Sequence, residues 1–261
     1  LAGFLTGWNY WFLWIVTCMA EITAAGIYMQ LWFPDSPKWM WALFALILMT
    51  IINLIAAKAF GELEFWFAMV KVVAIIFMIV LGLGLILFGL GNGGDAIGFS
   101  NLWSHGGFMP NGFGGLIAAL PIVMFAYLGV EMIGVTAGEA KNPKKIIPRA
   151  INTVLIRILV FYIGALTVIM AIYPWDQITD GNSPFVMMFE NVGIRYATGI
   201  INFVVLTAAL SSCNSGIFST GRMLFNLSHQ KQAPKIFGKV GKTGVPTNAI
   251  YMSAIVLLIG V

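Results

Sequence analysis

Charged residues are scarce in this chain. Only 9% of its 261 residues are Asp, Glu, Lys or Arg, whereas 60% are hydrophobic. Soluble domains use about 25% charged residues, and no stretch here is polar enough to form one. We therefore interpret residues 1–261 as a single membrane domain. The net charge of +4 is spread over several connections and forms no separate basic domain, which argues against nucleic acid as a partner.

Cysteine and histidine are also rare. Cys18 and Cys213 lie inside apolar stretches, so we expect them to be buried as small apolar residues and not to form a disulfide or a metal site. His105 and His229 fall in loops that we predict on opposite sides of a membrane, where they cannot share a metal ion. The sequence has no HExxH motif, no GxSxG motif and no metal-spaced Cys/His cluster. These absences argue against an enzyme and predict no cofactor.

Long apolar runs are what the chain has instead. A membrane helix needs about 20 mainly apolar residues. The sequence predicts seven such spans, at residues 4–31, 39–57, 65–90, 113–135, 151–173, 196–220 and 246–261. Because the chain starts at Leu1 instead of Met and ends within a short last span, we expect a fragment of a longer transporter-like protein, truncated at both ends.

Lys and Arg residues gather in alternate connections between these spans. The basic loops are residues 58–64, 136–150 and 221–245. Positive charge collects on the cytoplasmic side of membrane proteins, so this pattern places the three loops in the cytoplasm. The same rule predicts that Leu1 begins on the cytoplasmic side.

The fourth apolar span is interrupted. It contains Pro121, which removes a helical hydrogen bond, and Gly129, which lies two residues before Glu131. Irregular backbone within a membrane is tolerated only in the protein interior or around a cavity, and a broken span indicates a binding site in secondary transporters. The alternative is a kinked but continuous helix whose glycines permit close packing.

Four ionisable residues fall within predicted spans: Glu21, Lys71, Glu131 and Arg157. Each costs about 2.5–3.5 kcal/mol at the centre of a membrane helix, so a functional or paired role is the default interpretation. Lys71 and Arg157 are shallow enough to extend to the membrane surface instead. Residues 211–216, Ser-Ser-Cys-Asn-Ser-Gly, form a polar stripe that either makes interhelical hydrogen bonds or lines a ligand site.

Several long motifs occur in one order along the chain. They are KAFGELEFWFAMVKV at 58–72, FAYLGVE at 125–131, TAGEAKNPK at 136–144, IPRAI at 147–151, INFVVLT at 201–207 and STGRMLF at 219–225. With these motifs the chain resembles the bacterial amino-acid permeases of the amino acid–polyamine–organocation superfamily. The resemblance extends over essentially the whole chain, and it is closest to the proton-coupled permeases for neutral amino acids.

This resemblance implies an all-α membrane protein with a partial inverted-repeat fold. Members of the superfamily have twelve helices, of which the first ten form two inverted five-helix repeats. On that mapping the chain holds the third to ninth helices. The first helix, whose break cradles the substrate carboxylate, would lie before Leu1.

The resemblance also implies a substrate site. The broken helix would present the backbone of Phe125, Ala126, Tyr127 and Leu128 to the ammonium group of the substrate, with Phe125 as an aromatic gate. Ser211 and Ser212, with Asn214 nearby, would flank the substrate and cation sites.

Two of the ionisable residues receive coupling roles from the resemblance. Lys71 would take the place of the sodium ion of sodium-coupled relatives, and Glu131 matches an acid implicated in gating or proton handling. Glu21 receives no role. The expected function is import of a small neutral amino acid with a proton, by alternating access, across the bacterial plasma membrane.

Other functions remain open from the residues alone. An amino-acid exchanger of the same superfamily is the nearest alternative, and a channel is a more distant one. A retinal protein fits poorly, because the seventh span contains no lysine for a Schiff base.

Overall fold

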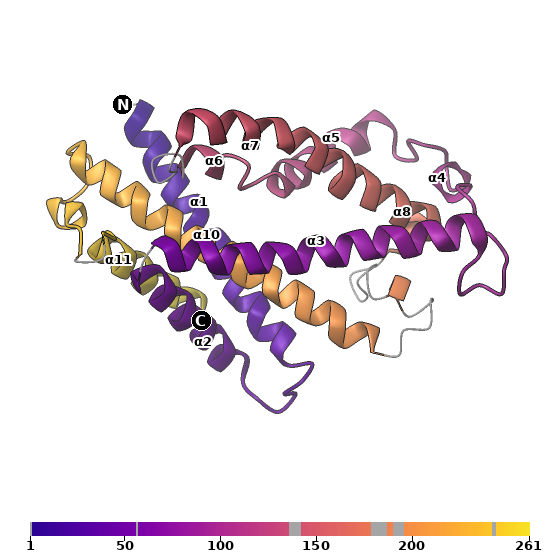
Figure 1. Cartoon of the computed structure of the whole chain (residues 1–261), viewed down its shortest axis with the longest axis horizontal. Coiled ribbons are helices and arrows are strands. Elements are labelled where there is room, and N and C mark those ends of the chain that lie inside the picture. Colours follow the sequence, from indigo (N-terminus) through magenta and orange to yellow (C-terminus); the bar gives the residue numbers. More distant parts are fainter. Residues whose placement is uncertain (1, 56, 136–141, 179–186, 190–195, 242–243) are drawn as a thin grey trace. The chain divides into compact units, whose positions relative to one another are not determined.

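A computed structural model of the chain describes all residues except 1, 56, 136–141, 179–186, 190–195 and 242–243 (Figure 1). The predictions for Leu1 and for part of two predicted loops, residues 136–141 and 242–243, therefore lie outside the described residues.

The described residues form helices joined by turns and contain no β-strand. The long elements are α1 (Ala2–Met29), α2 (Lys38–Ile55), α3 (Ala57–Phe88), α10 (Ala197–His229), and the continuous run of α7 (Pro143–Arg157), η2 (Ile158–Gly164) and α8 (Ala165–Ile172). The shorter ones are α4 (Asn101–Ser104), α5 (Gly112–Ala126), α6 (Met132–Val135), α11 (Thr247–Leu257), η3 (Trp175–Gln177), η4 (Lys235–Gly238) and η5 (Leu258–Gly260). The all-α prediction is confirmed.

Five helical stretches in the described part of the chain are long and apolar enough to cross a membrane. They correspond to the first, second, third, fifth and sixth predicted spans. The fourth and seventh predicted spans contain shorter apolar helices, Gly112–Ala126 and Thr247–Gly260.

The three predicted basic loops are largely helical, which corrects the sequence-based boundaries. Residues 58–64 belong to α3, residues 143–150 open α7, and residues 221–229 continue α10. These segments contain good helix formers such as Ala, Leu, Lys, Arg and Glu. The charged residues therefore indicate where the apolar part of each helix ends, and the helix itself continues beyond that point. Pro143 occupies the first turn of α7, where a missing N–H costs nothing. The cytoplasmic placement of these segments stays a prediction.

The chain divides into two compact units. The first unit comprises Leu1–Val72 and Asn202–Val261, and the second comprises Val73–Ile201. The boundaries fall inside α3 and α10, and each unit is described by itself below. The single membrane domain expected for residues 1–261 stays a prediction.

Apolar side chains of α1, α2, α10 and α11 form the core of the first unit. Ile22, Met49, Ile217, Ile250 and Leu257 are almost completely buried within one cluster. The expected burial of Cys18 and Cys213 is confirmed, since both are free thiols in this cluster. The Cys18 Sγ donates a hydrogen bond to the Cys213 carbonyl over 3.7 Å.

Close packing of α1 on α10 depends on Gly216. A Cβ atom at this position would lie 2.1 Å from Cys18 Sγ and 2.9 Å from the Trp14 ring. Gly216→Ala in the full-length protein should therefore destabilise the fold by about 1–3 kcal/mol through overpacking. Thermal unfolding in detergent measures the effect, with Gly61→Ala as the control because nothing lies within 4 Å of a Cβ there. Equal midpoints for the two variants would contradict this packing.

In the second unit, α8 is anchored to the turn that contains α4. The Asn101 side chain donates hydrogen bonds to the carbonyls of Ala171 at 2.9 Å and Ile172 at 3.2 Å, where the end of a helix leaves acceptors unsatisfied. Gly82 of α3 lets Val168 of α8 approach closely, since a Cβ there would lie 2.2 Å from Val168 Cγ1. These contacts fix the C-terminal half of the fifth predicted span.

Candidate functional site

The fourth predicted span is broken between Ala126 and Met132. Helix α5 ends at Ala126, residues 127–131 form turns, and α6 begins at Met132. Three-residue turn bonds run from Leu128 N to Phe125 O and from Met132 N to Gly129 O, both at 3.1 Å. The predicted interruption is therefore confirmed, and the alternative of a continuous kinked helix is wrong.

Gly129 causes the break, and Pro121 does not. Gly129 has a φ of +100°, a backbone conformation that residues with a side chain rarely adopt. Pro121 instead lies within α5, which continues past it for more than a turn. The expected contribution of Pro121 to the interruption is thus corrected.

Glu131 closes the broken segment. Its Oε2 accepts a hydrogen bond of 2.9 Å from the backbone N–H of Gly129, and the side chain is exposed. Glu131 also lines a hollow of about 530 Å³ between α6 and α7. The other residues in this lining are Val130, Ile133, Gly134, Ile147, Ile151, Val154, Leu155 and Ile158. The carboxyl group therefore lies beside a mainly apolar lining.

Tyr162 holds the other side of the break. Its hydroxyl donates a hydrogen bond of 2.7 Å to the Ala126 carbonyl. Its ring stacks on Tyr127, with the centroids 4.9 Å apart and the planes at 14°. Tyr162 lies on the π-helix η2, and such wide turns are frequent at functional sites. Sequence reasoning missed this residue, although a tyrosine hydroxyl inside an apolar span needs a partner.

Lys71 faces the interior of the first unit. Its Nζ donates a hydrogen bond of 2.8 Å to Ser211 Oγ on α10, and the side chain is half-buried. The alternative in which Lys71 extends to the membrane surface is therefore wrong. The Ser211 hydroxyl in turn donates to Glu64 Oε1 at 2.5 Å. Ser211 thus connects a basic and an acidic group of the same helix, α3.

Amide groups hold the second oxygen of Glu64. Asn214 Nδ2 donates to Glu64 Oε2 at 3.5 Å, and Asn214 Oδ1 accepts a hydrogen bond of 2.9 Å from Asn53 on α2. Asn53, Ser211 and Asn214 are buried. On α1, the Glu21 carboxyl lies within hydrogen-bonding reach of the Ser212 side chain and within electrostatic reach of Lys71. We call these residues the polar cluster: Glu21, Asn53, Glu64, Lys71, Ser211, Ser212 and Asn214.

Sequence reasoning found part of the polar cluster. The resemblance assigns roles to Lys71 and to the stripe with Ser211, Ser212 and Asn214, and the structure brings Lys71 and Ser211 into contact. Glu64 was missed because the charges of residues 58–64 predict a loop there. A signal was present, however, since Glu64 and Lys71 are seven residues apart and therefore share one face of a helix. Phe125, Ala126, Tyr127, Leu128 and Glu131 lie in the second unit, around the break.

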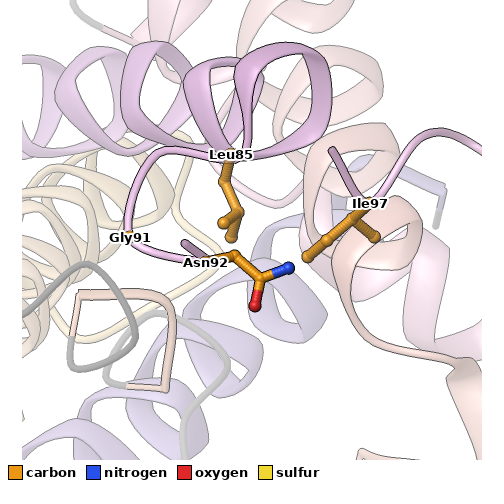
Figure 2. A pocket seen from close by; sticks show the side chains of 4 residues that line it. All are labelled: Leu85, Gly91, Asn92 and Ile97. Carbon is orange, nitrogen blue, oxygen red and sulfur yellow. The ribbon is translucent and has the colours of Figure 1, made fainter. Parts of the chain in front are cut away.

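A smaller hollow of about 160 Å³ lies beside the loop that follows α3 (Figure 2). It is lined by Leu85, Gly91, Asn92 and Ile97. The Asn92 side chain donates a hydrogen bond of 2.9 Å to the Asp95 carbonyl, so its amide stabilises the loop. No charged side chain belongs to this lining, and we assign it no functional role.

Comparison with known proteins decides the class of the molecule. The sequence profile of amino acid permeases matches residues 1–261. The chain belongs to the amino acid permease family. It is 66% identical to the uncharacterized amino acid permease YtnA, 54% identical to the probable threonine/serine transporter YbxG and 51% identical to the amino-acid permease AapA, all from Bacillus subtilis (strain 168).

Each of these alignments covers the whole permease chain and 56% of the relative. The chain therefore spans about half the length of these curated relatives. Family membership, together with the membrane-length helices, makes it a multi-pass integral membrane protein of the bacterial plasma membrane. The relatives are named as permeases and transporters and not as enzymes.

Proposed function

We propose that the full-length permease imports a small neutral amino acid together with a proton, by alternating access. The interruption of a membrane span at residues 127–131 is the observation that carries this proposal. Unwound backbone at membrane depth is tolerated in protein interiors and around cavities, and it is characteristic of substrate sites in secondary transporters. The family supports transport of an amino acid.

The ammonium group of the substrate would bind at the C-terminal end of α5. Carbonyl groups at a helix C-terminus carry partial negative charge, and Phe125, Ala126, Tyr127 and Leu128 supply them here. Phe125 is 60% exposed, so its ring is available to cover a bound amino acid. In the described residues, Glu131 is the one carboxylate of the broken segment, which favours a neutral substrate over a cationic one. The name of YbxG makes threonine and serine the first candidates.

Coupling would depend on the polar cluster and on Glu131. The Lys71 ammonium can supply the positive charge that Na⁺ provides in sodium-coupled transporters, and gaining or losing a proton changes that charge. One elementary charge crossing 100 mV releases about 2.3 kcal/mol, which corresponds to roughly 50-fold accumulation. Ser211 and Ser212 stay predicted substrate contacts, and both hydroxyls have partners in the polar cluster.

Uptake by the full-length protein in proteoliposomes tests this function. We expect saturable uptake of labelled glycine, alanine, serine, threonine or proline, stereoselective for the chiral substrates, that rises with an inward proton gradient and collapses with a protonophore. Uptake that requires an amino acid on the opposite side and ignores the gradient would identify an exchanger. Single-channel currents in place of saturable uptake would identify a channel.

Tyr162→Phe should weaken apparent substrate affinity two- to tenfold. The change retains the ring that stacks on Tyr127 but removes the hydrogen bond to the Ala126 carbonyl, which contributes about 1 kcal/mol to holding the broken segment. The KM of uptake measures the effect. Tyr196→Phe is the matched control, because the Tyr196 side chain is 74% exposed. Equal KM values for both variants would show that this bond does not position the site.

A further inference from the structure

We propose that Glu64 passes the coupling proton between Lys71 and water, with the Ser211 hydroxyl as the bridge. This inference rests on the proposed proton symport. It adds the pathway that the proton follows and names Glu64 as the side chain that accepts it last. It starts from an uninterrupted line of hydrogen bonds in the first unit, from Lys71 Nζ to Ser211 Oγ and from Ser211 Oγ to Glu64 Oε1.

Ser211 has the geometry of a relay. A hydroxyl can accept one hydrogen bond while it donates another, and here it accepts from Lys71 at 2.8 Å and donates to Glu64 at 2.5 Å. The Lys71 ammonium gives a proton to Ser211 Oγ while the hydroxyl proton of Ser211 passes to Glu64 Oε1. The products are a neutral amine, an unchanged hydroxyl and a carboxylic acid. Glu64 then releases its proton to water, so no other reactant is needed.

Glu64 lies on the route from Lys71 toward the polar end of α3. Seven residues separate the two, or about 10 Å along the helix axis. Ser211 is buried whereas Glu64 is half-buried, and the neighbouring Gly61 and Glu62 are exposed. Exposure therefore increases along the line from the bridging hydroxyl to the acid. On the predicted orientation this end of α3 is cytoplasmic, which is where an imported proton must leave.

Among the described residues, the packed helices give Glu64 neutral hydrogen-bond partners, and Glu21 is an acid near Lys71. From α10, Asn214 donates to Glu64 Oε2, and from α2, Asn53 orients Asn214. These amides hold one carboxylate oxygen and leave Oε1 to Ser211. From α1, Glu21 acts on Lys71 by its charge and reaches Ser212. The hydrogen-bonded line from Lys71 thus runs through Ser211 to Glu64, and Glu21 lies within electrostatic reach of its start.

Glu64→Gln in the full-length protein tests the relay. Glutamine keeps the shape of the side chain and accepts a hydrogen bond at its oxygen, but it cannot take up a proton. We expect net uptake driven by a proton gradient to fall at least tenfold. Substrate exchange at equal pH on both sides, which needs no proton release, should stay within twofold of wild type. Ser211→Ala, which removes the bridge, should lower gradient-driven net uptake by a similar factor.

Glu62→Gln provides the matched control, because it makes the same chemical change on an exposed side chain of the same helix. It should leave both uptake and exchange unchanged. Glu64→Gln with wild-type net uptake and pH profile would overturn the relay. Parallel loss of uptake and exchange would also overturn it, since that pattern indicates a structural role alone. Wild-type protein without gradient-driven uptake would instead refute the proposed symport, and the relay with it.

Discussion

Replacing Lys71 with alanine in the full-length protein should abolish uptake driven by a proton gradient. The substitution removes the positive charge from the polar cluster. It also removes the ammonium group that donates a hydrogen bond to Ser211 Oγ. A buried charge left without its partner is strongly unfavourable, and without the Lys71 amine no group at this position can gain or lose a proton to couple proton entry to transport. We expect the initial rate of gradient-driven uptake to fall at least about 100-fold, or about 2.8 kcal/mol.

Lys38→Ala is the matched control for this change. Lys38 begins α2 and its side chain is exposed, so uptake should be unaffected there. Initial rates with and without an imposed gradient separate coupling from transport itself. If Lys71→Ala keeps the wild-type dependence on the gradient, then Lys71 has no role in coupling.

Gly129→Ala should also have a large effect on transport. Its φ of +100° lies in a region that L-residues rarely adopt, and nothing lies within 4 Å of a Cβ at this position. The cost is therefore conformational and not steric, at about 1–2 kcal/mol. Because the same turn sets the carbonyls near Tyr127 and Leu128, the apparent KM should rise roughly five- to 30-fold.

Gly114→Ala on α5 is the control for Gly129. A Cβ there also has nothing within 4 Å, and its φ is not positive. Alanine favours a helix by about 1 kcal/mol over glycine, so this variant should be neutral or slightly stabilised. Uptake kinetics and thermal unfolding of both variants give the comparison. Wild-type kinetics in Gly129→Ala would show that the turn does not position the substrate.

Hydropathy and motif order predicted most of the fold. The helix class, the approximate location of each helix and the break near Gly129 all follow from local properties of the sequence. The ends of the helices do not follow from such properties. The charged residues between Lys58 and Glu64 favour contact with water, but they are also compatible with a helix. The loop predicted over residues 58–64 also leaves Glu64 out of the expected site, because a residue in a loop shares no helical face with Lys71.

Contacts between residues that are distant in the sequence could not be predicted either. Lys71 and Ser211 are 140 residues apart, and Glu64 and Asn214 are 150 apart. Such contacts depend on how α3 packs against α10, which no periodicity in either helix specifies. The π-helix at Ile158–Gly164 likewise has no distinct composition, so the position of Tyr162 opposite Ala126 became visible only in three dimensions.

Substrate protection at the end of α5 tests the central claim most directly. Phe125→Cys and Phe113→Cys in the full-length protein place thiols at two exposed sites of the same helix, where the native rings are 60% and 70% exposed. Maleimide labelling of both is measured with a transported amino acid and with its non-transported enantiomer. The transported amino acid should slow labelling at position 125 and leave position 113 unchanged. Equal labelling rates at position 125 with and without substrate, in protein that transports, would contradict the proposed site.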